Sequence, residues 1–171
     1  FPPGTSDEPL TVAQNLPDID GMVIVTTPQE VALLDSRKSI TFANSLKVDV
    51  IGVIENMSGY TIRGKAPSGS EIELAAPGGK TVRVTADEEG HWSGTLDIFK
   101  SGGGEKTAEE FGVPFLGKLP FDPGFVRGGD DGVHRIVSEP DGPASQAFAE
   151  VVAQIQSKVE SGSTGSGLEI I

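Results

Sequence analysis

Residues 50–59 read VIGVIENMSG, an apolar run followed by a polar turn that ends in glycine. Val50–Ile54 is continuous and mostly β-branched, which is the pattern of a parallel strand covered on both faces. Residues 22–26, MVIVT, have the same pattern, and residues 114–119, PFLGKL, add a third apolar run. The sequence therefore predicts about three parallel strands.

Helical patterns separate these strands. Thr27, Pro28 and Glu30 have the spacing of a capping box with proline at the first helical position, so we predict a helix from Thr27 to about Leu46. A shorter helix is predicted for residues 105–111, and a last helix begins at Pro143. Apolar residues recur in that last helix at helical spacing: Ala144, Phe148, Val151, Ile155 and Val159. The alternation of strands and helices indicates an α/β fold with a parallel sheet.

Residues 61–96 interrupt this alternation. Residues 71–74 and 81–85 alternate polar and apolar side chains, and the turn signals at 77–79 and 87–90 follow them. We therefore predict a small antiparallel β meander inserted into an α/β domain made of residues 1–60 and 97–159. Residues 160–171 contain a Ser/Gly/Thr-rich stretch and are predicted to form a flexible tail.

Composition excludes several classes of function. The net charge is −12, from 25 acidic and 13 basic residues, which argues against nucleic acid or an anionic membrane as a partner. The chain has no cysteine, so its own residues cannot form a disulfide, a zinc ribbon or a thiolate-held cluster. No apolar run approaches the length of a membrane span and no signal segment is present, from which we expect a cytoplasmic protein.

Several polar positions have two interpretations each. The glycine-rich residues 102–106 lack the spacing of a phosphate loop, which favours a flexible helix entry with open amides. His91 and His134 have no second ligand at metal-binding spacing, so we expect surface histidines. Trp92 is expected to pack on the inserted β segment rather than on a ligand. The acidic groups at 87–89 and 130–131 are expected to be solvated turn charges rather than catalytic carboxylates.

Six motifs, taken together and in this order, resemble the Mrp/ApbC family of iron–sulfur cluster carriers, which are P-loop ATPases. They are PPGTSDEPLT at 2–11, VTTPQEVALLD at 25–35, ENMSG at 55–59, DIFKSGGGEK at 97–106, PFLGKLP at 114–120 and EPD at 139–141. The resemblance implies a Rossmann-like P-loop NTPase fold related to the ParA and MinD ATPases. It also implies a homodimer that binds ATP and Mg and carries a 4Fe-4S cluster to iron–sulfur apoproteins in the cytosol.

The resemblance also implies roles for individual residues. Pro3, Gly4 and Thr5 match the switch segment that approaches the γ-phosphate. Asn56, at the end of its strand, matches the residue that reads adenine, and a carboxamide has the paired donor and acceptor that an adenine edge requires. For Asn56 the other interpretation is a cap of the strand end, because asparagine is a common turn residue. Pro120, Phe121 and Asp122 match the other wall of the base site.

The chain departs from the family pattern in three ways. The phosphate loop, and an aspartate that precedes the Pro-Pro-Gly switch, are expected upstream of Phe1. Many family members have a Cys-x-x-Cys where this chain has residues 61–96. That segment instead resembles the end of a bacterial Ig-like repeat, through residues 64–70 and 86–93. Without amides to cradle the phosphates, phosphoryl transfer loses most of its stabilisation.

Three hypotheses follow from these departures. The chain is a nucleotide-binding half-domain that is inactive alone; or a non-enzymatic binding or structural module whose β insert is the functional part; or an engineered chimera. In each case the sheet has an edge that should meet the phosphate-loop strand. We expect that edge to be covered by the insert, by residues Leu168–Ile171 or by a second copy of the chain. The partner is expected to be that second copy, in a homodimer, or a missing amino-terminal half.

Overall fold

The three apolar runs form one parallel sheet. The structure, a computed structural model, describes residues 7–16 and 19–162. In it β1 (Met22–Thr26), β2 (Val50–Glu55) and β7 (Phe115–Lys118) lie in the order β1-β2-β7, and both pairs of strands are parallel. The predicted α/β class and its parallel sheet are therefore confirmed.

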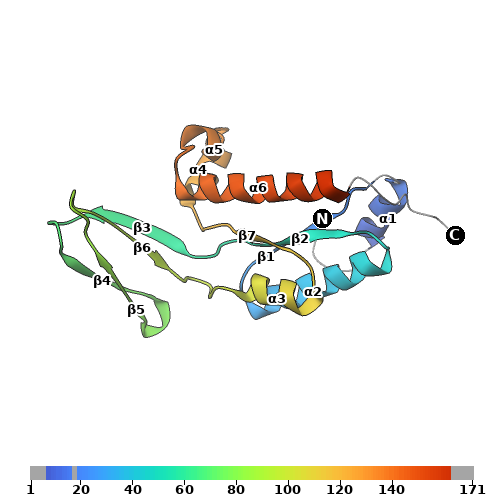
Figure 1. Cartoon of the computed structure of the whole chain (residues 1–171), viewed down its shortest axis with the longest axis horizontal. Helices are drawn as coiled ribbons and strands as arrows, with labels where there is room; N and C mark the ends of the chain where they lie inside the picture. The colour runs from blue at the N-terminus through green and yellow to red at the C-terminus, as the bar shows by residue number, and fades with distance from the viewer. Residues whose placement is uncertain (1–6, 17–18, 163–171) are drawn as a thin grey trace.

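Helices cover both faces of this sheet (Figure 1). On one face lie α2 (Glu30–Ser45) and α3 (Gly103–Phe111), and they enclose a core of Ile24, Ile40, Val53 and Ala108. On the other face lies α6 (Pro143–Gly162), whose Val151 packs with Ile54 and Leu116. Two buried layers explain why β2 is apolar at successive positions and does not alternate.

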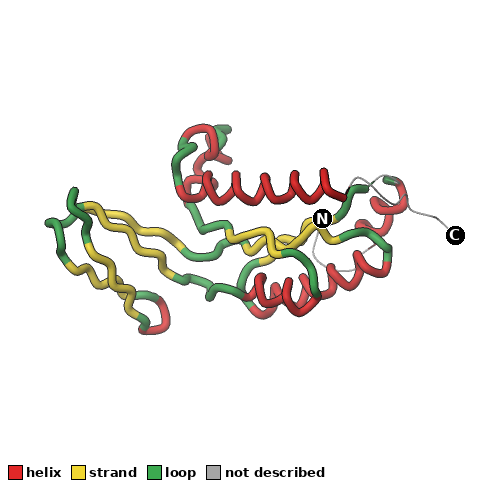
Figure 2. The backbone as a smooth tube through the Cα atoms, in the orientation of Figure 1, coloured by secondary structure: helices red, strands yellow, loops and turns green. Residues whose placement is uncertain are grey.

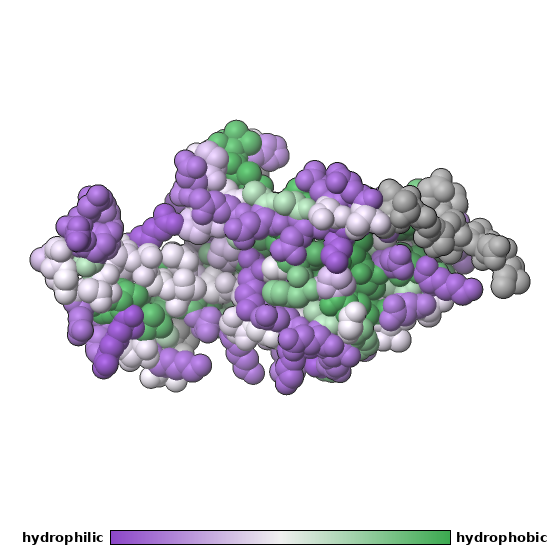
Figure 3. Space-filling view, in the orientation of Figure 1, coloured by the Kyte–Doolittle hydropathy of each residue, from purple (hydrophilic) through white to green (hydrophobic). Residues whose placement is uncertain are grey.

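The remaining helices lie at the periphery. They are α1 (Asp7–Asn15), α4 (Pro123–Asp131) and α5 (Arg135–Ser138). Asp130 and Asp131 are exposed, as predicted. The prediction that they lie in a turn was wrong, because both residues lie in the last turn of α4. A cluster of apolar side chains is exposed over α5 (Figure 3), where Ile136 and Val137 lie. Among the helices of the described residues, none combines the length and the apolar character needed to cross a membrane.

The start of α2 differs from the predicted capping box. The helix begins at Glu30, and its N-cap is Gln29, whose backbone is extended and whose side chain does not cap. Thr27 donates its hydroxyl to the Gln29 carboxamide rather than to a helical amide. Pro28 is buried, so it belongs to the packed connection before the helix and not to its first turn.

Residues 60–96 form an extension that we call the arm (Figure 2). Its outer strands β3 (Tyr60–Lys65) and β6 (His91–Leu96) pair antiparallel, and its inner strands β4 (Glu71–Ala75) and β5 (Thr81–Thr85) pair antiparallel in a second sheet. The one-turn 3-10 helix η1 (Pro77–Gly79) joins β4 to β5. The antiparallel prediction is confirmed, but the meander was wrong because one hairpin is nested inside the other.

Small residues let the layers of the arm approach closely. A side chain at Gly94 would overlap Leu74 and approach Val84, and a side chain at Gly64 would overlap the indole of Trp92. Trp92 therefore packs on the arm itself, as predicted. Two two-stranded ribbons bury little surface separately, so this contact between them supplies the core that neither hairpin has alone.

One edge of the sheet, opposite the edge formed by β7, is the outer side of β1. Within the described residues β1 pairs with β2 alone, and the strands of the arm pair only with one another. The expectation that the arm covers this edge was therefore wrong. Leu168–Ile171 lie outside the described residues, and covering of the edge by a second copy of the chain stays a prediction.

Candidate functional site

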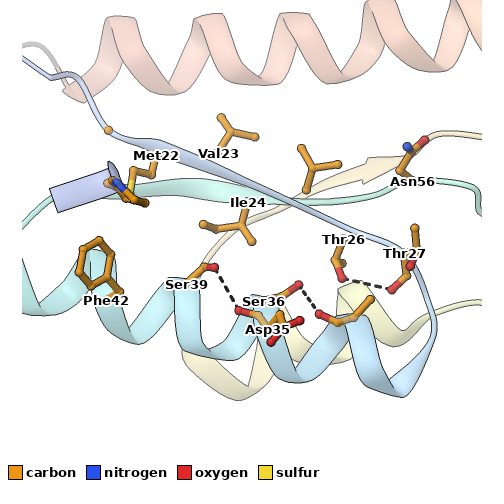
Figure 4. Close-up of a pocket in the computed structure, with 14 residues that line it drawn as sticks. Met22, Val23, Ile24, Thr26, Thr27, Asp35, Ser36, Ser39, Phe42 and Asn56 are labelled. Carbon is orange, nitrogen blue, oxygen red and sulfur yellow. Dashed lines mark hydrogen bonds between the residues drawn. The ribbon is translucent and has the colours of Figure 1, made fainter. Parts of the chain in front are cut away.

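The carboxyl ends of the strands gather the polar residues of this domain. In open α/β sheets, ligands bind beyond these ends. A cavity of about 530 Å³ lies between β1 and α2 and reaches this end of the sheet (Figure 4). Fourteen residues line it: Pro9, Gly21, Met22, Val23, Ile24, Val25, Thr26, Thr27, Ala32, Asp35, Ser36, Ser39, Phe42 and Asn56.

Asn56 is a polar residue of the cavity whose side chain is free to bind a ligand. The Ser36 and Ser39 hydroxyls donate to carbonyls of their own helix, at 2.9 and 3.0 Å. The Asn56 main-chain N–H donates to the Thr26 carbonyl at 2.7 Å and so fixes the residue beside β1. Its side-chain carboxamide makes no hydrogen bond with any residue in the part of the chain that the structure describes. A donor and an acceptor are therefore both available at the mouth of the cavity.

Glu55, the residue before Asn56, has a fully buried side chain. Its carboxylate accepts from the Ser58 hydroxyl at 2.6 Å and from the Gly102 and Gly104 amides at 3.0 and 2.7 Å. Burial alone would raise the pKa of Glu55, but these three donors, with the charge of Lys118, outweigh it and hold the pKa below its ordinary value. The carboxylate is therefore ionised at neutral pH and occupies the amino-terminal end of α3.

The glycine-rich segment is explained by this contact. The predicted helix entry is confirmed, but its amides are not open, because Glu55 accepts from two of them. Gly102 has a φ of 86°, in the left-handed region. A Cβ at Gly104 would lie 3.0 Å from Cβ of Glu55 and 3.3 Å from Cγ2 of Thr26, so only glycine fits without displacement. The segment serves close packing, and phosphate binding by it has no support here.

Pro120, Phe121 and Asp122 follow β7 and do not line the cavity. The Phe121 amide donates to the Gly59 carbonyl at 2.8 Å, and its ring meets Tyr60 edge to face at 5.9 Å. These residues therefore contact the base of the arm. Their predicted role as the second wall of a base site stays a prediction, as does that of Asn56.

Asp122 is the N-cap of α4. It accepts from the Gly124 amide at 2.7 Å and pairs with Arg135 at 2.8 Å. Burial would raise the pKa of Asp122, but the hydrogen bonds from Arg135 and Gly124 lower it further than burial raises it. The residue connects α4 to α5 and so stabilises the segment that follows β7.

Among the other predicted positions, those that the structure describes do not line the cavity. Pro3, Gly4 and Thr5 lie outside the described residues. His91 is exposed, with Nδ1 3.6 Å from a Glu89 carboxylate oxygen, and His134 is exposed at the N-cap of α5. No group of three or more His, Cys, Asp or Glu residues in ranges 7–16 and 19–162 could hold a metal ion.

Comparison with known families gives one match along most of the chain. A ParA family model, described as NUBPL iron-transfer P-loop NTPase, matches residues 1–81 and 84–156. Two curated relatives are the iron–sulfur cluster carrier proteins of Methanocaldococcus jannaschii and Pyrococcus abyssi. They are 41% and 40% identical over 159 and 160 residues. The aligned residues are 93% and 94% of this chain, but they span only 45% and 44% of the relatives' own length.

Solved structures share the fold. A nucleotide-binding protein from Archaeoglobus fulgidus, solved in complex with ADP, is 28% identical with a TM-score of 0.51. The match covers 86% of this chain and 48% of that one. The cell-division ATPase MinD of Pyrococcus furiosus is 17% identical with a TM-score of 0.50, covering 81% of this chain and 43% of its own.

Proposed function

We propose that this chain, which belongs to the family of NUBPL iron-transfer P-loop NTPases, forms the adenine-side half of an ATP-binding, cytoplasmic iron–sulfur cluster carrier. The observation that carries the proposal is the carboxamide of Asn56, unbonded within the described residues, where the cavity between β1 and α2 reaches the carboxyl end of the sheet. Its donor and acceptor match the two groups on an adenine edge. Relatives carry the names of cluster carriers, and one similar structure holds ADP.

The open edge of β1 supports the proposal that this chain is one half of a larger domain. The Met22 N–H donates to the Asp49 carbonyl and the Thr26 carbonyl accepts from Asn56, so these residues direct their main-chain groups toward β2. Because main-chain groups alternate along a strand, Val23 and Val25 present theirs at the open edge. An added parallel strand would satisfy them and would end beside Asn56. We assign this place to the strand that precedes a phosphate loop.

Phosphate binding and cluster binding are assigned to residues outside these 171. The 171 residues contain neither a G-x-x-x-x-G-K-[ST] motif nor a cysteine. We assign the amides and lysine that cradle ATP and Mg, and the thiolates that hold a 4Fe-4S cargo, to an amino-terminal half outside these 171 residues; a second copy in a homodimer would supply them only if it carried that half. Iron–sulfur apoproteins are the proposed recipients of the cluster. Alone, the 171 residues should have negligible ATPase activity.

A hybrid protein tests the proposal. The amino-terminal half of the Methanocaldococcus jannaschii relative is joined to residues 1–171, and ATP affinity is measured by calorimetry with Mg. The 171 residues alone should not bind ATP at micromolar concentration, whereas the hybrid should. In the hybrid, Asn56→Ala should weaken ATP about tenfold, because two hydrogen bonds to the base are lost at about 0.5–1.5 kcal/mol each.

The controls separate base recognition from folding. Inorganic tripolyphosphate has no base, so its affinity should be the same for the Asn56→Ala hybrid and the parent. Asn44→Ala changes an exposed asparagine on α2 outside the cavity and should leave both affinities unchanged. Equal ATP affinity in parent and Asn56→Ala would contradict the base-reading role, and micromolar ATP binding by the 171 residues alone would contradict the half-domain proposal.

The arm supports a second candidate, a binding module carried on an α/β scaffold. Among the described residues its strands pair only with one another, so its structure does not depend on pairing with the parallel sheet. Residues 62–96 are deleted and the gap is closed. If the shortened chain folds and ATP binding by the hybrid persists while binding of an apoprotein is lost, the arm is the part that recognises the recipient.

A further inference from the structure

The arm joins the α/β domain at two places, and one side chain binds both. Residues Ser58 and Gly59 lead into β3, and residues 97–102 lead from β6 to α3, whose second residue is Gly104. Oε1 of Glu55 accepts from Ser58 on the first connection and from Gly102 on the second, and Oε2 accepts from Gly104. The main-chain carbonyl of Glu55 also accepts from the Leu119 amide at 2.8 Å. Glu55 therefore contacts every segment that meets at the base of the arm.

Backbone strain marks the same two connections. Among the described residues, three that are not glycine have a left-handed φ, and two of them are Met57 at 55° and Lys100 at 75°. Met57 lies between Asn56 and Ser58, and Lys100 lies two residues before Gly102. Such conformations cost free energy and persist only where the surroundings enforce them. The hydrogen bonds of Glu55 to Ser58 and Gly102 are the contacts that enforce them here.

We propose that Glu55 is a positioning residue, whose carboxylate ties both ends of the arm to the strand end that carries Asn56. A cap of α3 would need only the Gly102 and Gly104 amides. The third bond, to Ser58, closes a loop around Asn56 and Met57 and so fixes the direction of the Asn56 side chain. A displacement of the arm then reaches Asn56 through Glu55. The consequence for ATP rests on the proposed function, whereas the positioning of Asn56 does not.

The test uses the chain of 171 residues and needs no nucleotide. Glu55→Gln keeps the shape of the side chain, but a carboxamide has one acceptor oxygen and cannot serve all three donors. By NMR, amide exchange should become at least tenfold faster at Gly102, at Gly104 or at both, according to which oxygen position the NH2 group takes, and the side-chain NH2 signals of Asn56 should shift and broaden. The Val53 amide, which donates to the Pro114 carbonyl at 2.8 Å, reports the stability of the sheet and should change less.

Glu105→Gln is the matched control. Glu105 lies in the first turn of α3, and its exposed carboxylate pairs with Lys118 at 2.9 Å without a bond to the loop amides. Glu105→Gln should leave the amide exchange rates of Gly102 and Gly104, and the side-chain NH2 signals of Asn56, as they are in the parent chain. Failure of ATP binding in the hybrid would refute the proposed function but would leave these signals unaffected, so the two proposals fail separately.

Two results would overturn the inference. One is unchanged exchange at Gly102 and Gly104 in Glu55→Gln. The other is faster exchange at these glycines with Asn56 signals at their parent positions, which would make Glu55 a cap of α3 only. If Glu55→Gln does not fold, Ser58→Ala removes one of the three bonds. The Asn56 signals should then shift while Val53 stays protected, and unshifted signals would overturn the inference.

Discussion

Replacement of two helical glycines by alanine should change stability in opposite directions. Gly104 and Gly129 both lie within helices, α3 and α4, and neither has a left-handed φ. In a helix interior alanine is favoured over glycine by about 0.8–1.0 kcal/mol. Outside the backbone of α4 itself, no described atom lies within 4 Å of a Cβ added at Gly129, so Gly129→Ala, in the last turn of the helix, should stabilise the protein by up to about that amount.

Gly104→Ala should destabilise the protein. Its Cβ would meet Cβ of Glu55 at 3.0 Å and, at 3.3 Å each, Oε2 of Glu55 and Cγ2 of Thr26. Both neighbours are buried, and Cβ of Glu55 is fixed to the backbone of β2, so neither side chain can move aside. Overpacking costs about 1–3 kcal/mol. Displacement of α3 would also weaken the hydrogen bond from the Gly104 amide to Glu55, a bond to a charged acceptor worth about 1.5–3 kcal/mol.

The net expectation for Gly104→Ala, after the helix-propensity gain, is a loss of about 1–3 kcal/mol. Urea unfolding followed by far-UV circular dichroism measures it. With a slope of about 2 kcal/mol per molar urea, the midpoint should fall by about 1 M for Gly104→Ala and rise by less than half of that for Gly129→Ala. If Gly104→Ala raises the midpoint as Gly129→Ala does, α3 is not packed against Glu55 and the account of the glycine-rich segment is refuted.

Three further predictions concern buried polar groups. Thr107 is fully buried and its hydroxyl has no hydrogen-bond partner among the residues that the structure describes, so Thr107→Val should raise the free energy of unfolding by about 1 kcal/mol in urea titrations. The pKa values of Glu55 and Asp122 are lowered in the folded protein from their ordinary values of 4.5 and 3.8. The stability that their ionised forms confer is therefore fully present above the ordinary values. It is lost as the pH falls through the lower pKa values of the folded protein. Urea midpoints measured from neutral pH to about pH 3 should therefore fall less for Glu55→Gln than for the parent chain. Asp122→Ala should cost about 1 kcal/mol or more through loss of the N-cap of α4, and Asp130→Ala, an exposed change in the same helix, should cost less.

The parallel sheet could be predicted from the sequence because its signal is local. A continuous β-branched run such as Val50–Ile54 has no exposed face, and only a strand between two layers of helices satisfies it. The last helix was equally predictable, since Ala144 and Val151 recur on one face and are both buried. In both cases the pattern within one element determines which side must be covered.

The start of α2 and the pairing within the arm could not be predicted in this way. A capping box specifies which side-chain and main-chain groups are able to hydrogen-bond, but other partners compete. Here the Thr27 hydroxyl donates to the nearby Gln29 carboxamide oxygen instead. In the arm, the alternation of residues 71–74 and 81–85 specifies strands with one buried face. It does not specify which strand pairs with which, because a meander and a nested hairpin bury the same faces.

The role of Glu55 was also missed, although the sequence contains a signal for it. A carboxylate directly after the buried run Val50–Ile54 has to find hydrogen-bond donors, since an isolated buried charge is costly. The three successive glycines at 102–104 offer unobstructed amides. Nothing local connects the two features, which are 47 and 49 residues apart in the hydrogen bonds that join them.

The position of the arm explains why so large a segment leaves the sheet intact. Its outer strands pair from Tyr60 with Leu96 out to Lys65 with His91, so the chain leaves and re-enters the α/β domain at one place. The free-energy cost of a connection depends on bringing its ends together, and antiparallel pairing does this within the arm itself. For the packing of β2 and α3, the arm therefore has the same effect as a short loop between them. Glu55 has to bind only the two ends of the arm. The register of β2 with β7 is then independent of what the arm contains, which is why the strand runs predicted the sheet correctly while the pairing inside the arm remained undetermined.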